Sequence, residues 1–323
     1  MKILANDGIS AAGKEKLEAN GFTVVTTNVP QTQLADAINT EGYVGLLVRS
    51  ATTARKELID ACPNLRFIGR GGVGMDNIDV EYARSKGITV FNTPGSSSLS
   101  VAELVMAQLF DMVRSLYDSN RQMPVNGLKE FNALKKKYGK GSELRGKTLG
   151  IIGFGRIGRA VASYALGCGM KVVAYDRMPS NAPVQLHIAG HGNIDVLVPH
   201  VSMEELLSVS DLITLHVPKQ DGGVAVLGAA ELAMCKKGVY VVNTARGGSI
   251  NEDALVAALN SGQVAAAALD VFENEPTPRE DLLTHARISL TPHIGAATEE
   301  AQDRIGEEIA DIVLAMNLAG VKN

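Results

Sequence analysis

The 323-residue chain has few cysteines, no tryptophan and no long hydrophobic run. Its three cysteines, Cys62, Cys168 and Cys235, lie far apart and form no Cys-x-x-Cys pair, which argues against a disulfide framework and gives no metal-ligand spacing. No apolar stretch approaches the roughly 18 residues of a membrane span, and the apolar run at the start is too short for a signal peptide. A net charge of −4 argues against a nucleic-acid-binding surface. We therefore expect a cytoplasmic protein that binds no nucleic acid, membrane or metal.

Short β-type runs alternate with helical patterns along the chain. Such alternation predicts an α/β fold, in which helices cover both faces of parallel sheets. Before residue 100 the expected strands are residues 2–5, 22–26, 44–48, 66–69 and 89–91. After residue 146 they are residues 148–152, 171–175, 212–216, 239–243, 266–270 and 288–290. With 323 residues the chain is long enough for two domains, each with its own sheet.

Two long helical patterns mark the places where the chain would pass between these domains. Residues 99–122 carry an apolar stripe, and residues 298–318 begin with acidic side chains that suit a helix N-terminus. We expect the first helix to lead into the second domain and the last helix to return to the first. The predicted division is residues 1–98, completed by residues 296–323, for one domain, and residues 99–295 for the other.

A glycine fingerprint follows the expected strand at residues 148–152. Residues 153–158 read Gly-Phe-Gly-Arg-Ile-Gly and open a helical pattern, and a second strand then ends at Asp176, about 20 residues further on. In such a unit Gly153 permits a tight turn, Gly155 lets a pyrophosphate approach the backbone, and Gly158 allows the helix to pack closely on the strand. Asp176 can accept a hydrogen bond from a ribose 2′-hydroxyl and would repel a 2′-phosphate. The pattern predicts a dinucleotide site that favours NAD over NADP.

Three polar side chains follow later strands of the same predicted sheet. They are Arg246 in a glycine-flanked turn, Glu275 on a loop and His293 directly after a strand. Each by itself could be an ordinary surface or turn residue. The carboxyl ends of parallel strands share one edge, where ligands bind, so the three are expected to converge. A guanidinium can hold a carboxylate or α-oxygen, an imidazole can take a hydroxyl proton, and a carboxylate beside that imidazole can fix its tautomer.

The chain resembles the D-isomer-specific 2-hydroxyacid dehydrogenase family along nearly its whole length. The matching motifs are GFGRIG at 153–158, LHVP at 215–218, NTARGG at 243–248, AALDVFENEP at 267–276 and TPHIGA at 291–296. The resemblance implies a Rossmann-type doubly wound NAD-binding domain at residues 99–295. It also implies a flavodoxin-like α/β substrate domain made of the remaining residues. In that family the matching Arg, Glu and His form the catalytic set, which implies this role for Arg246, Glu275 and His293.

The resemblance also implies the residues that contact the cofactor, which is expected to be NAD. With the fingerprint glycines they are Gly153, Gly155, Arg156, Ile157, Gly158, Asp176, His216, Val217, Pro218, Thr244, Ala245, Arg246, Asp270, His293, Gly295 and Ala296. Asp270 is expected near the nicotinamide carboxamide.

The same resemblance assigns the glycine-rich segment at residues 71–78 to the substrate carboxylate, through backbone N–H groups. Within the family the first domain is most similar to phosphoglycerate dehydrogenases, in which two arginines that match Arg49 and Arg70 meet the substrate phosphate. Taken only as residues, these two could also be surface arginines that follow strands. The expected substrate contacts are Arg49, Ser50, Arg70, Gly72, Val73, Gly74, Arg246 and His293.

One departure from that subgroup concerns the loop after the first long helix. Members of that subgroup often carry Gly-Lys-Trp in this loop. Residues 126–129 contain no tryptophan, so the substrate contacts of the subgroup's loop cannot be transferred to this sequence. We expect Lys135 or a neighbour to supply charge from this region, although the lysine run at 135–137 is more simply a solvated face. The resemblance further implies a homodimer through residues 99–122. Because the sequence stops at Asn323, we expect it to lack the regulatory domain that longer phosphoglycerate dehydrogenases carry, and hence to show no serine inhibition through such a domain.

The leading hypothesis is NAD-dependent oxidation of D-3-phosphoglycerate to 3-phosphohydroxypyruvate. A hydroxypyruvate or glyoxylate reductase, or another D-2-hydroxyacid dehydrogenase, would share the catalytic set without needing Arg49 and Arg70. Formate dehydrogenases share the fold but carry Gln in place of the catalytic Glu, so Glu275 argues against that activity. The non-enzymatic alternative is an NAD(H)-sensing, corepressor-like binding protein.

Overall fold

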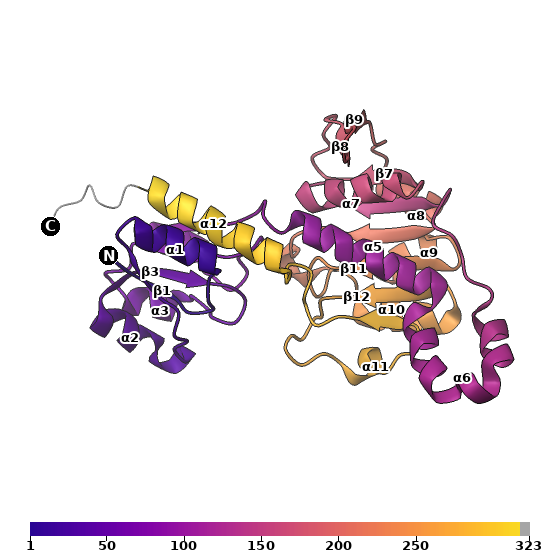
Figure 1. Ribbon diagram of the computed structural model, residues 1–323, viewed down its shortest axis with the longest axis horizontal. Helices are drawn as coiled ribbons and strands as arrows, with labels where there is room; N and C mark the ends of the chain where they lie inside the picture. The colour runs from indigo at the N-terminus through magenta and orange to yellow at the C-terminus, as the bar shows by residue number, and fades with distance from the viewer. Residues whose placement is uncertain (317–323) are drawn as a thin grey trace. The chain divides into compact units, whose positions relative to one another are not determined.

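The computed structural model describes residues 1–316 and divides into two compact units (Figure 1). The first unit consists of Met1–Ser98 together with the chain from Ala296 onward, and the second of Leu99–Gly295. The part of the predicted last helix and of the predicted 296–323 segment beyond Met316 lies outside the described residues. Both units contain a parallel sheet covered by helices, so the predicted α/β class, with a Rossmann-type sheet, is confirmed.

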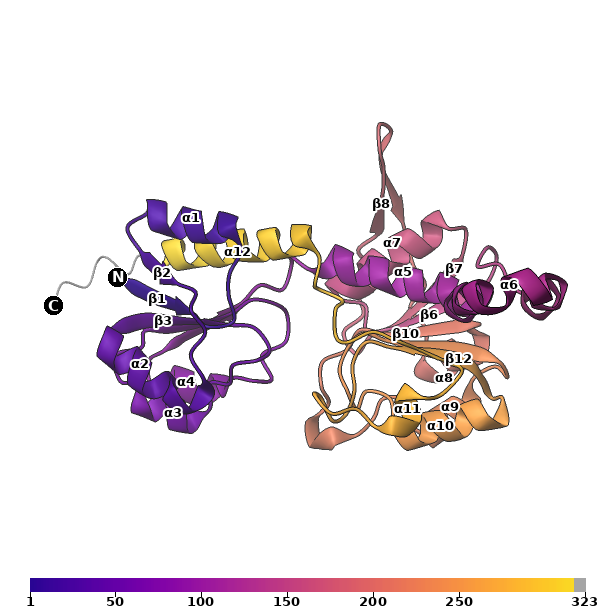
Figure 2. The ribbon, with the colours of Figure 1, turned by 60° about the horizontal axis from the view of Figure 1, so that its bottom comes forward.

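The first unit is built on a five-stranded parallel sheet with the order β2-β1-β3-β4-β5. Its strands are β1 (Lys2–Ala5), β2 (Thr23–Val25), β3 (Tyr43–Val48), β4 (Phe67–Arg70) and β5 (Thr89–Asn92). Its helices are α1 (Ala11–Ala19), α2 (Leu34–Glu41), α3 (Lys56–Ala61), α4 (Val80–Ser85) and α12 (Glu299–Ala315), with a short 3-10 turn at Gln31–Gln33. α1 and α12 cover one face of the sheet and α2, α3 and α4 the other (Figure 2).

The strand sequences explain why both faces are covered. Successive side chains of a strand point to opposite faces. In β1, Ile3 packs under α1 and α12 whereas Leu4 packs against the helices of the other face. In β3, Leu47 packs under α1 and α12, and Leu46 packs against the helices of the other face. A strand that buries both faces in this manner is a continuous apolar run, as is typical of parallel strands covered by helices on both sides.

The second unit is built on a six-stranded parallel sheet with the order β13-β12-β11-β10-β6-β7. Its strands are β6 (Thr148–Ile152), β7 (Lys171–Tyr175), β10 (Leu212–Leu215), β11 (Val239–Asn243), β12 (Val264–Leu269) and β13 (Ile288–Leu290). α5 (Ser98–Arg114) and α7 (Arg156–Gly167) pack on one face, and α8 (Met203–Val209), α9 (Ala229–Met234) and α10 (Glu252–Ser261) on the other. The strand order reverses direction beside β6, so the edge at its carboxyl end is the place where such sheets bind ligands.

Two elements of the second unit differ from the sequence-based expectation. The helix expected over residues 99–122 is interrupted at Ser115, which has a left-handed φ of 51°, and continues as α6 (Leu116–Tyr138). The carboxylate of Asp111 accepts a hydrogen bond from the N–H of Tyr117 across this break. The apolar stripe on which the prediction rests lies within residues 101–113 and carries no signal of the break at Ser115, so one helix was predicted where the structure has two.

The second difference is an antiparallel hairpin, β8 (Val184–Ile188) and β9 (Gly192–Val196), that no expected strand anticipated (Figure 1). Its base is held to α7, because the Arg159 guanidinium donates to the carbonyls of Ala182 and Pro183 and the Ser163 hydroxyl donates to the carbonyl of Gln185. The hairpin is short and mostly solvent-exposed, so it lacks the buried apolar run by which the other strands were predicted.

Within residues 1–316 no helix has both the length and the apolar character needed to cross a membrane. The same part of the chain contains no group of three His, Cys, Asp or Glu side chains placed to hold a metal ion.

α1 and α12 of the first unit cross at a pair of glycines, Gly13 and Gly306. A Cβ atom added to Gly13 would lie 2.5 Å from the backbone carbon and oxygen of Gly306. We predict that Gly13→Ala separates the two helices and lowers the free energy of unfolding by about 1–3 kcal/mol, the usual cost of overpacking. The measurement is thermal unfolding followed by circular dichroism.

Gly167→Ala is the matched control, because Gly167 also lies in a helix but has open space where its Cβ would be. It should leave the unfolding temperature unchanged or raise it slightly. Equal unfolding temperatures for Gly13→Ala and the wild type would show that the crossing is not closely packed.

Candidate active site

The glycine fingerprint forms the turn between β6 and α7. Gly153 has a φ of 91°, and a Cβ there would lie 2.4 Å from the carbonyl oxygen of His216, so only glycine fits. A Cβ on Gly158 would lie 2.2 Å from the carbonyl oxygen of Gly153, which lets α7 start close to the strand. Gly155, by contrast, faces open space. The turn therefore packs tightly on its inner side and exposes its backbone on the outer side, where a phosphate group could approach.

The N-terminus of α7 and the residue Asp176 complete this turn. No side chain caps α7, so its first N–H groups have no side-chain acceptor among residues 1–316. The Asp176 carboxylate, at the end of β7, accepts hydrogen bonds from the N–H of Phe154 at 2.7 Å and of Met178 at 2.9 Å. A carboxylate offers about four acceptor positions, so Asp176 braces the turn and still has capacity for a ribose hydroxyl.

Two further polar side chains near these strand ends are buried. The Thr244 hydroxyl, just after β11, is buried and has no hydrogen-bond partner among the described residues. His216 follows β10, and its Nε2 lies 3.0 Å from Thr214 Oγ1. Burial lowers the pKa of His216 to about 3. His216 is therefore neutral at physiological pH and can support the fingerprint turn without adding a positive charge next to a cofactor.

The turn that carries Arg246 is shaped by the side chain of Asn243 at the end of β11. Asn243 Oδ1 accepts from the N–H of Ala245 at 3.0 Å, and its Nδ2 donates to the carbonyl of Arg246 at 3.0 Å. The Arg246 guanidinium donates back to the carbonyl of Ala245 at 2.6 Å. A Cβ on Gly247 would lie 1.8 Å from the carbonyl oxygen of Phe272, so this turn touches the loop that follows β12.

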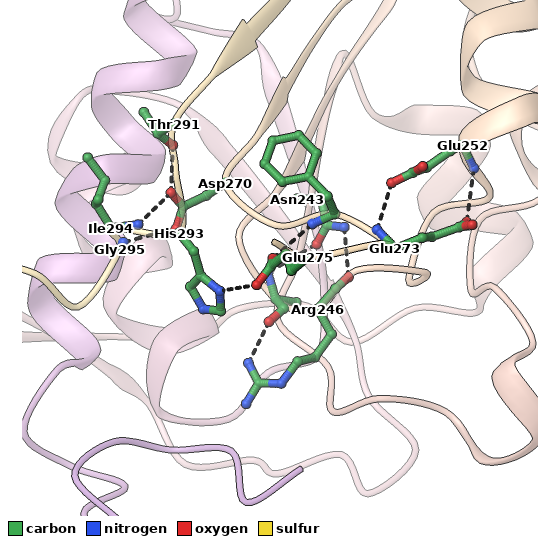
Figure 3. Close-up of polar contacts among 12 residues, drawn as sticks. Asn243, Arg246, Glu252, Asp270, Glu273, Glu275, Thr291, His293, Ile294 and Gly295 are labelled. Atoms are coloured by element: carbon green, nitrogen blue, oxygen red, sulfur yellow. Dashed lines mark hydrogen bonds and ion pairs between the residues drawn. The ribbon is translucent and has the colours of Figure 1, made fainter. Parts of the chain in front are cut away.

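Glu275 and His293 form a direct hydrogen-bonded pair (Figure 3). The distance from His293 Nδ1 to Glu275 Oε2 is 2.8 Å, and Glu275 Oε1 accepts the N–H of Phe272 at 3.0 Å. The side chains are 41% and 37% exposed, so the pair is accessible from solvent. When Nδ1 carries the proton toward the carboxylate, Nε2 has a free lone pair that can accept a proton. A cavity of about 380 Å³ adjoins the pair and is lined mainly by apolar residues between Phe272 and His293.

Asp270 holds the turn that contains His293. This buried carboxylate accepts from the Thr291 hydroxyl at 2.6 Å and from the N–H groups of Ile294 at 2.8 Å and Gly295 at 2.9 Å (Figure 3). His293 has a left-handed φ of 54°, which is uncommon for a residue other than glycine. The three hydrogen bonds flank His293 on both sides and so stabilise its unusual backbone. They leave Asp270 about one acceptor position for its predicted cofactor contact.

In the first unit the loop after β3 carries Arg49 and Ser50. Asp7 Oδ2 accepts from the N–H of Arg49 at 2.6 Å and of Thr52 at 3.0 Å, and Asp7 Oδ1 accepts from the Thr52 hydroxyl at 2.5 Å. Asn77 Nδ2 donates to the carbonyls of Arg49 and Thr52 at 2.9 and 2.6 Å. Hydrogen bonds from two other segments thus hold this loop in one conformation. A cavity of about 250 Å³ adjoins it and is lined in part by Arg49 and Gly71.

The glycine-rich segment after β4 is held by Thr93. The N–H of Gly72 donates to Thr93 Oγ1 at 2.8 Å, and the N–H of Thr93 donates to the carbonyl of Gly72 at 3.1 Å. A Cβ on Gly72 would lie 2.0 Å from Arg70 Nη1, so the Arg70 guanidinium lies over this glycine. Val73 is 36% exposed, so the next part of the segment is open to solvent.

The structure thus gathers the predicted residues into two groups. The second unit brings together Arg246, Glu275 and His293, and Asp270 holds the turn that carries His293 (Figure 3). The first unit brings together Arg49 and Ser50, which follow β3, with Arg70, the last residue of β4, and Gly72, Val73 and Gly74, which follow β4. Of the remaining predicted contacts, Val217 and Pro218 follow β10, Ala245 follows β11, and Arg156 and Ile157 begin α7. Ala296 begins the last segment of the first unit, and Lys135 is exposed on α6.

Several supporting residues were not anticipated from the sequence. They are Asp7 and Asn77 in the first unit, and Glu252, Glu273 and Gln108 in the second. Gln108 Nε2 donates to the Thr291 hydroxyl, which in turn donates to Asp270. Each acts through a hydrogen bond to a segment far away in the sequence, and a local sequence motif does not predict such a contact. The acidic residue in the first helical turn after the NTARGG motif was the one available signal for Glu252.

Comparison with known proteins gives a consistent result. Residues 106–295 match the family described as "D-isomer specific 2-hydroxyacid dehydrogenase, NAD binding domain". The chain is 41% identical over 327 aligned residues to a D-3-phosphoglycerate dehydrogenase of Sus scrofa, which covers all of this chain and 58% of that protein. It is 45% identical over 269 residues to a hydroxypyruvate reductase of Thermotoga maritima, which covers 82% of each chain.

Among solved structures, a glyoxylate reductase from Paecilomyes thermophila superposes with a TM-score of 0.82 at 29% identity, covering 100% of this chain and 97% of that one. The chain therefore spans nearly all of the glyoxylate reductase chain but little more than half the length of the pig protein.

The buried imidazole of His216 gives a pH-dependent stability that can be tested. Its native pKa of about 3 lies below that of an exposed histidine, so the unfolded chain binds a proton that the native chain does not. We predict that the free energy of unfolding falls as the pH drops below about 6.5, with a contribution from His216 of about 1.4 kcal/mol per pH unit. Urea unfolding at several pH values between about 4.5 and 7 measures it.

His216→Gln should remove this part of the pH dependence, whereas His187→Gln, at an exposed histidine of the β8–β9 hairpin, should keep it. An unchanged slope in His216→Gln would mean that His216 is protonated in the native state.

Proposed function

The chain belongs to the D-isomer specific 2-hydroxyacid dehydrogenase family, and we propose that within it the protein is an NAD-dependent D-3-phosphoglycerate dehydrogenase. The observation that carries the proposal is the hydrogen-bonded pair of His293 and Glu275 beside Arg246. These residues follow strands β11, β12 and β13 of the sheet in which β6 leads into the glycine fingerprint. An acid–base pair and a guanidinium next to a nicotinamide are the groups that oxidation of a 2-hydroxy acid requires.

The residues around the fingerprint fit NAD. Gly155 leaves room for a pyrophosphate at the uncapped N-terminus of α7, and the buried Thr244 hydroxyl lacks a partner among the described residues. Asp176, at the end of β7, suits a ribose 2′-hydroxyl and disfavours a 2′-phosphate. When bound, NAD supplies the acceptor for the hydride. The protein's contribution is to hold the substrate and to take its proton.

In the proposed reaction His293 Nε2 accepts the proton of the substrate 2-hydroxyl while the hydride leaves the same carbon. The products are the 2-oxo acid, the reduced cofactor and a protonated imidazole. Glu275 stabilises that positive charge through Nδ1 and fixes the tautomer in which Nε2 is the base. Arg246 would bind the carboxylate or the developing carbonyl oxygen, where a planar guanidinium can donate two parallel hydrogen bonds.

The first unit would bind the ends of the substrate. Backbone N–H groups of residues 73 and 74 suit the carboxylate, whereas the N–H of Gly72 is already bound to Thr93 Oγ1. Arg49 and Arg70 supply positive charge for a phosphate. The loop of Arg49 is already held by Asp7 and Asn77, so little conformational entropy would be lost when it binds. The similarity to D-3-phosphoglycerate dehydrogenases over the whole chain supports this substrate.

A second candidate is a hydroxypyruvate or glyoxylate reductase. The observation that favours it is the 45% identity to the Thermotoga maritima hydroxypyruvate reductase over 82% of both chains. The two functions share Arg246, Glu275 and His293 and differ in the need for a phosphate site.

We also propose a homodimer through α5 and α6. α6 exposes a series of large apolar side chains, which water-facing helices rarely carry together. They are Leu116, Tyr117, Met123, Val125, Leu128 and Phe131.

Removal of the proposed base tests the mechanism. We predict that His293→Ala lowers kcat by at least about a hundredfold with D-3-phosphoglycerate and NAD, because no other group takes the hydroxyl proton. Binding of NADH, followed by its fluorescence, should change little. His187→Ala is the control and should keep full turnover. Near-normal kcat in His293→Ala would remove His293 from the proton transfer.

The phosphate assignment is tested at Arg49. We predict that Arg49→Ala raises KM for D-3-phosphoglycerate by about tenfold or more and leaves KM for unphosphorylated D-2-hydroxy acids nearly unchanged, because only the former carries the phosphate. Arg84→Ala, an exposed arginine on α4 of the same unit, should alter neither value. Steady-state kinetics with a panel of phosphorylated and unphosphorylated acids, each with NAD and NADP, measures both. Equal effects on both kinds of acid would favour the reductase instead.

A further inference from the structure

Two glutamates outside the catalytic set exchange hydrogen bonds with each other's backbone. The N–H of Glu273 donates to Glu252 Oε1 at 2.8 Å, and the N–H of Glu252 donates to Glu273 Oε1 at 3.4 Å (Figure 3). Glu252 is the first residue of α10, and Glu273 lies in the loop after β12, two residues before Glu275. The exchange therefore ties the loop that carries Glu275 to the start of α10.

Glu252 occupies an unusual place for a carboxylate. The residue is only 5% exposed, and burial raises the pKa of Glu252, as does the negative charge of Glu273. Asp281 acts in the same direction, and the guanidinium of Arg279 opposes it. A buried carboxyl group is costly unless its hydrogen bonds are made. The N–H of Glu273 donates such a hydrogen bond to the Glu252 carboxylate, and it does so from a loop outside α10.

The rest of this loop is fastened at both ends. Near its start, the carbonyl of Phe272 lies against Gly247, which leaves no room for a Cβ. Beyond its end, the Arg279 guanidinium donates to Asp253 of α10 at 2.5 Å and to Asp281 at 2.7 Å. Between these points the N–H of Phe272 donates to Glu275 Oε1, while Glu275 Oε2 meets His293. The position of the Glu275 carboxylate thus depends on the conformation of residues 272–275.

We propose that Glu252 is a positioning residue: through the N–H of Glu273 it holds the turn at residues 272–275, and it thereby keeps the Glu275 carboxylate on His293 Nδ1. Glu252 touches neither substrate nor cofactor in this role. Its effect on catalysis rests on the proposed function, whereas its effect on the Glu275–His293 hydrogen bond does not.

The role predicts different results for different substitutions of Glu252. Glu252→Ala removes the acceptor for the Glu273 N–H and frees the turn. Glu252→Asp keeps a charge at the start of α10 but shortens the side chain, so it loses the same hydrogen bond without opening a large cavity. Glu252→Gln retains an oxygen at the same reach and should restore the contact. Glu231→Ala is the matched control, because Glu231 also accepts a backbone N–H in the first turn of a helix, from Gly228, but does not touch this loop.

The first measurement is the ¹⁵N NMR spectrum of the histidine side chains in the full chain with NADH added, which requires no turnover. In the wild type and in Glu252→Gln, His293 should show one fixed tautomer with the proton on Nδ1. In Glu252→Ala and Glu252→Asp the His293 signals should move toward those of a mixture of tautomers. Glu231→Ala should match the wild type. Wild-type His293 signals in both Glu252→Ala and Glu252→Asp would overturn the proposal.

The second measurement is the pH profile of kcat/KM for the hydroxy acid that the wild type oxidises. Glu252→Ala and Glu252→Asp should lower kcat by about tenfold and move the acidic limb to lower pH, the same direction as expected for Glu275→Gln, while NADH affinity stays within about twofold. A merely structural role would lower the unfolding temperature, as is expected for Glu231→Ala, and leave this limb in place, which would contradict the proposal. An inactive wild type with the expected NMR changes would instead refute the proposed function and leave the positioning role standing.

Discussion

Hydrogen bonds from backbone N–H groups to buried or half-buried carboxylates hold the loops on which the candidate site depends. Asp176 braces the fingerprint turn, Asp270 holds the turn of His293, and Glu252 holds the loop of Glu275. In the first unit Asp7 does the same for the loop of Arg49. A hydrogen bond to an ionised group contributes about 1.5–3 kcal/mol, more than a neutral one. Loops at the ends of parallel strands lack the backbone hydrogen bonds that join neighbouring strands in a sheet. In these loops the carboxylates accept the backbone N–H groups instead.

This arrangement separates the residues that position from the residues that react. Asp270, Glu252 and Asn243 direct their hydrogen bonds inward, to backbone groups of the site's own loops. His293, Glu275 and Arg246 are left partly exposed at the strand ends. A left-handed backbone at His293 persists because the N–H groups that follow it are bound by Asp270. The acid–base pair can then be rigid although it lies on loops, which proton transfer at a fixed atom requires.

Much of the fold was predictable because its signals are local. Strands buried on both faces show continuous apolar runs, and the glycine fingerprint between β6 and α7 has a fixed spacing. The two predictions that failed, the single helix at residues 99–122 and the missed hairpin, also have local causes. The break at Ser115 comes after the apolar stripe of α5, which does not mark it, and the exposed β8–β9 hairpin has no buried run. The roles of the two units and the contacts of the individual site residues with cofactor and substrate stay predictions.

The α/β class, the dinucleotide fingerprint and the candidate residues Arg246, Glu275 and His293 at strand ends could be read from the amino-acid sequence, because each depends on residue types at short spacing. Three contacts appear only in the folded chain: His293 Nδ1 is hydrogen-bonded to Glu275, the Asp270 carboxylate binds the N–H groups that follow His293, and Glu252 accepts the N–H of Glu273. The physical reason is that these hydrogen bonds join residues about twenty positions apart in the chain. Their geometry exists only after β11, β12 and β13 have paired in register and brought their ends to one edge.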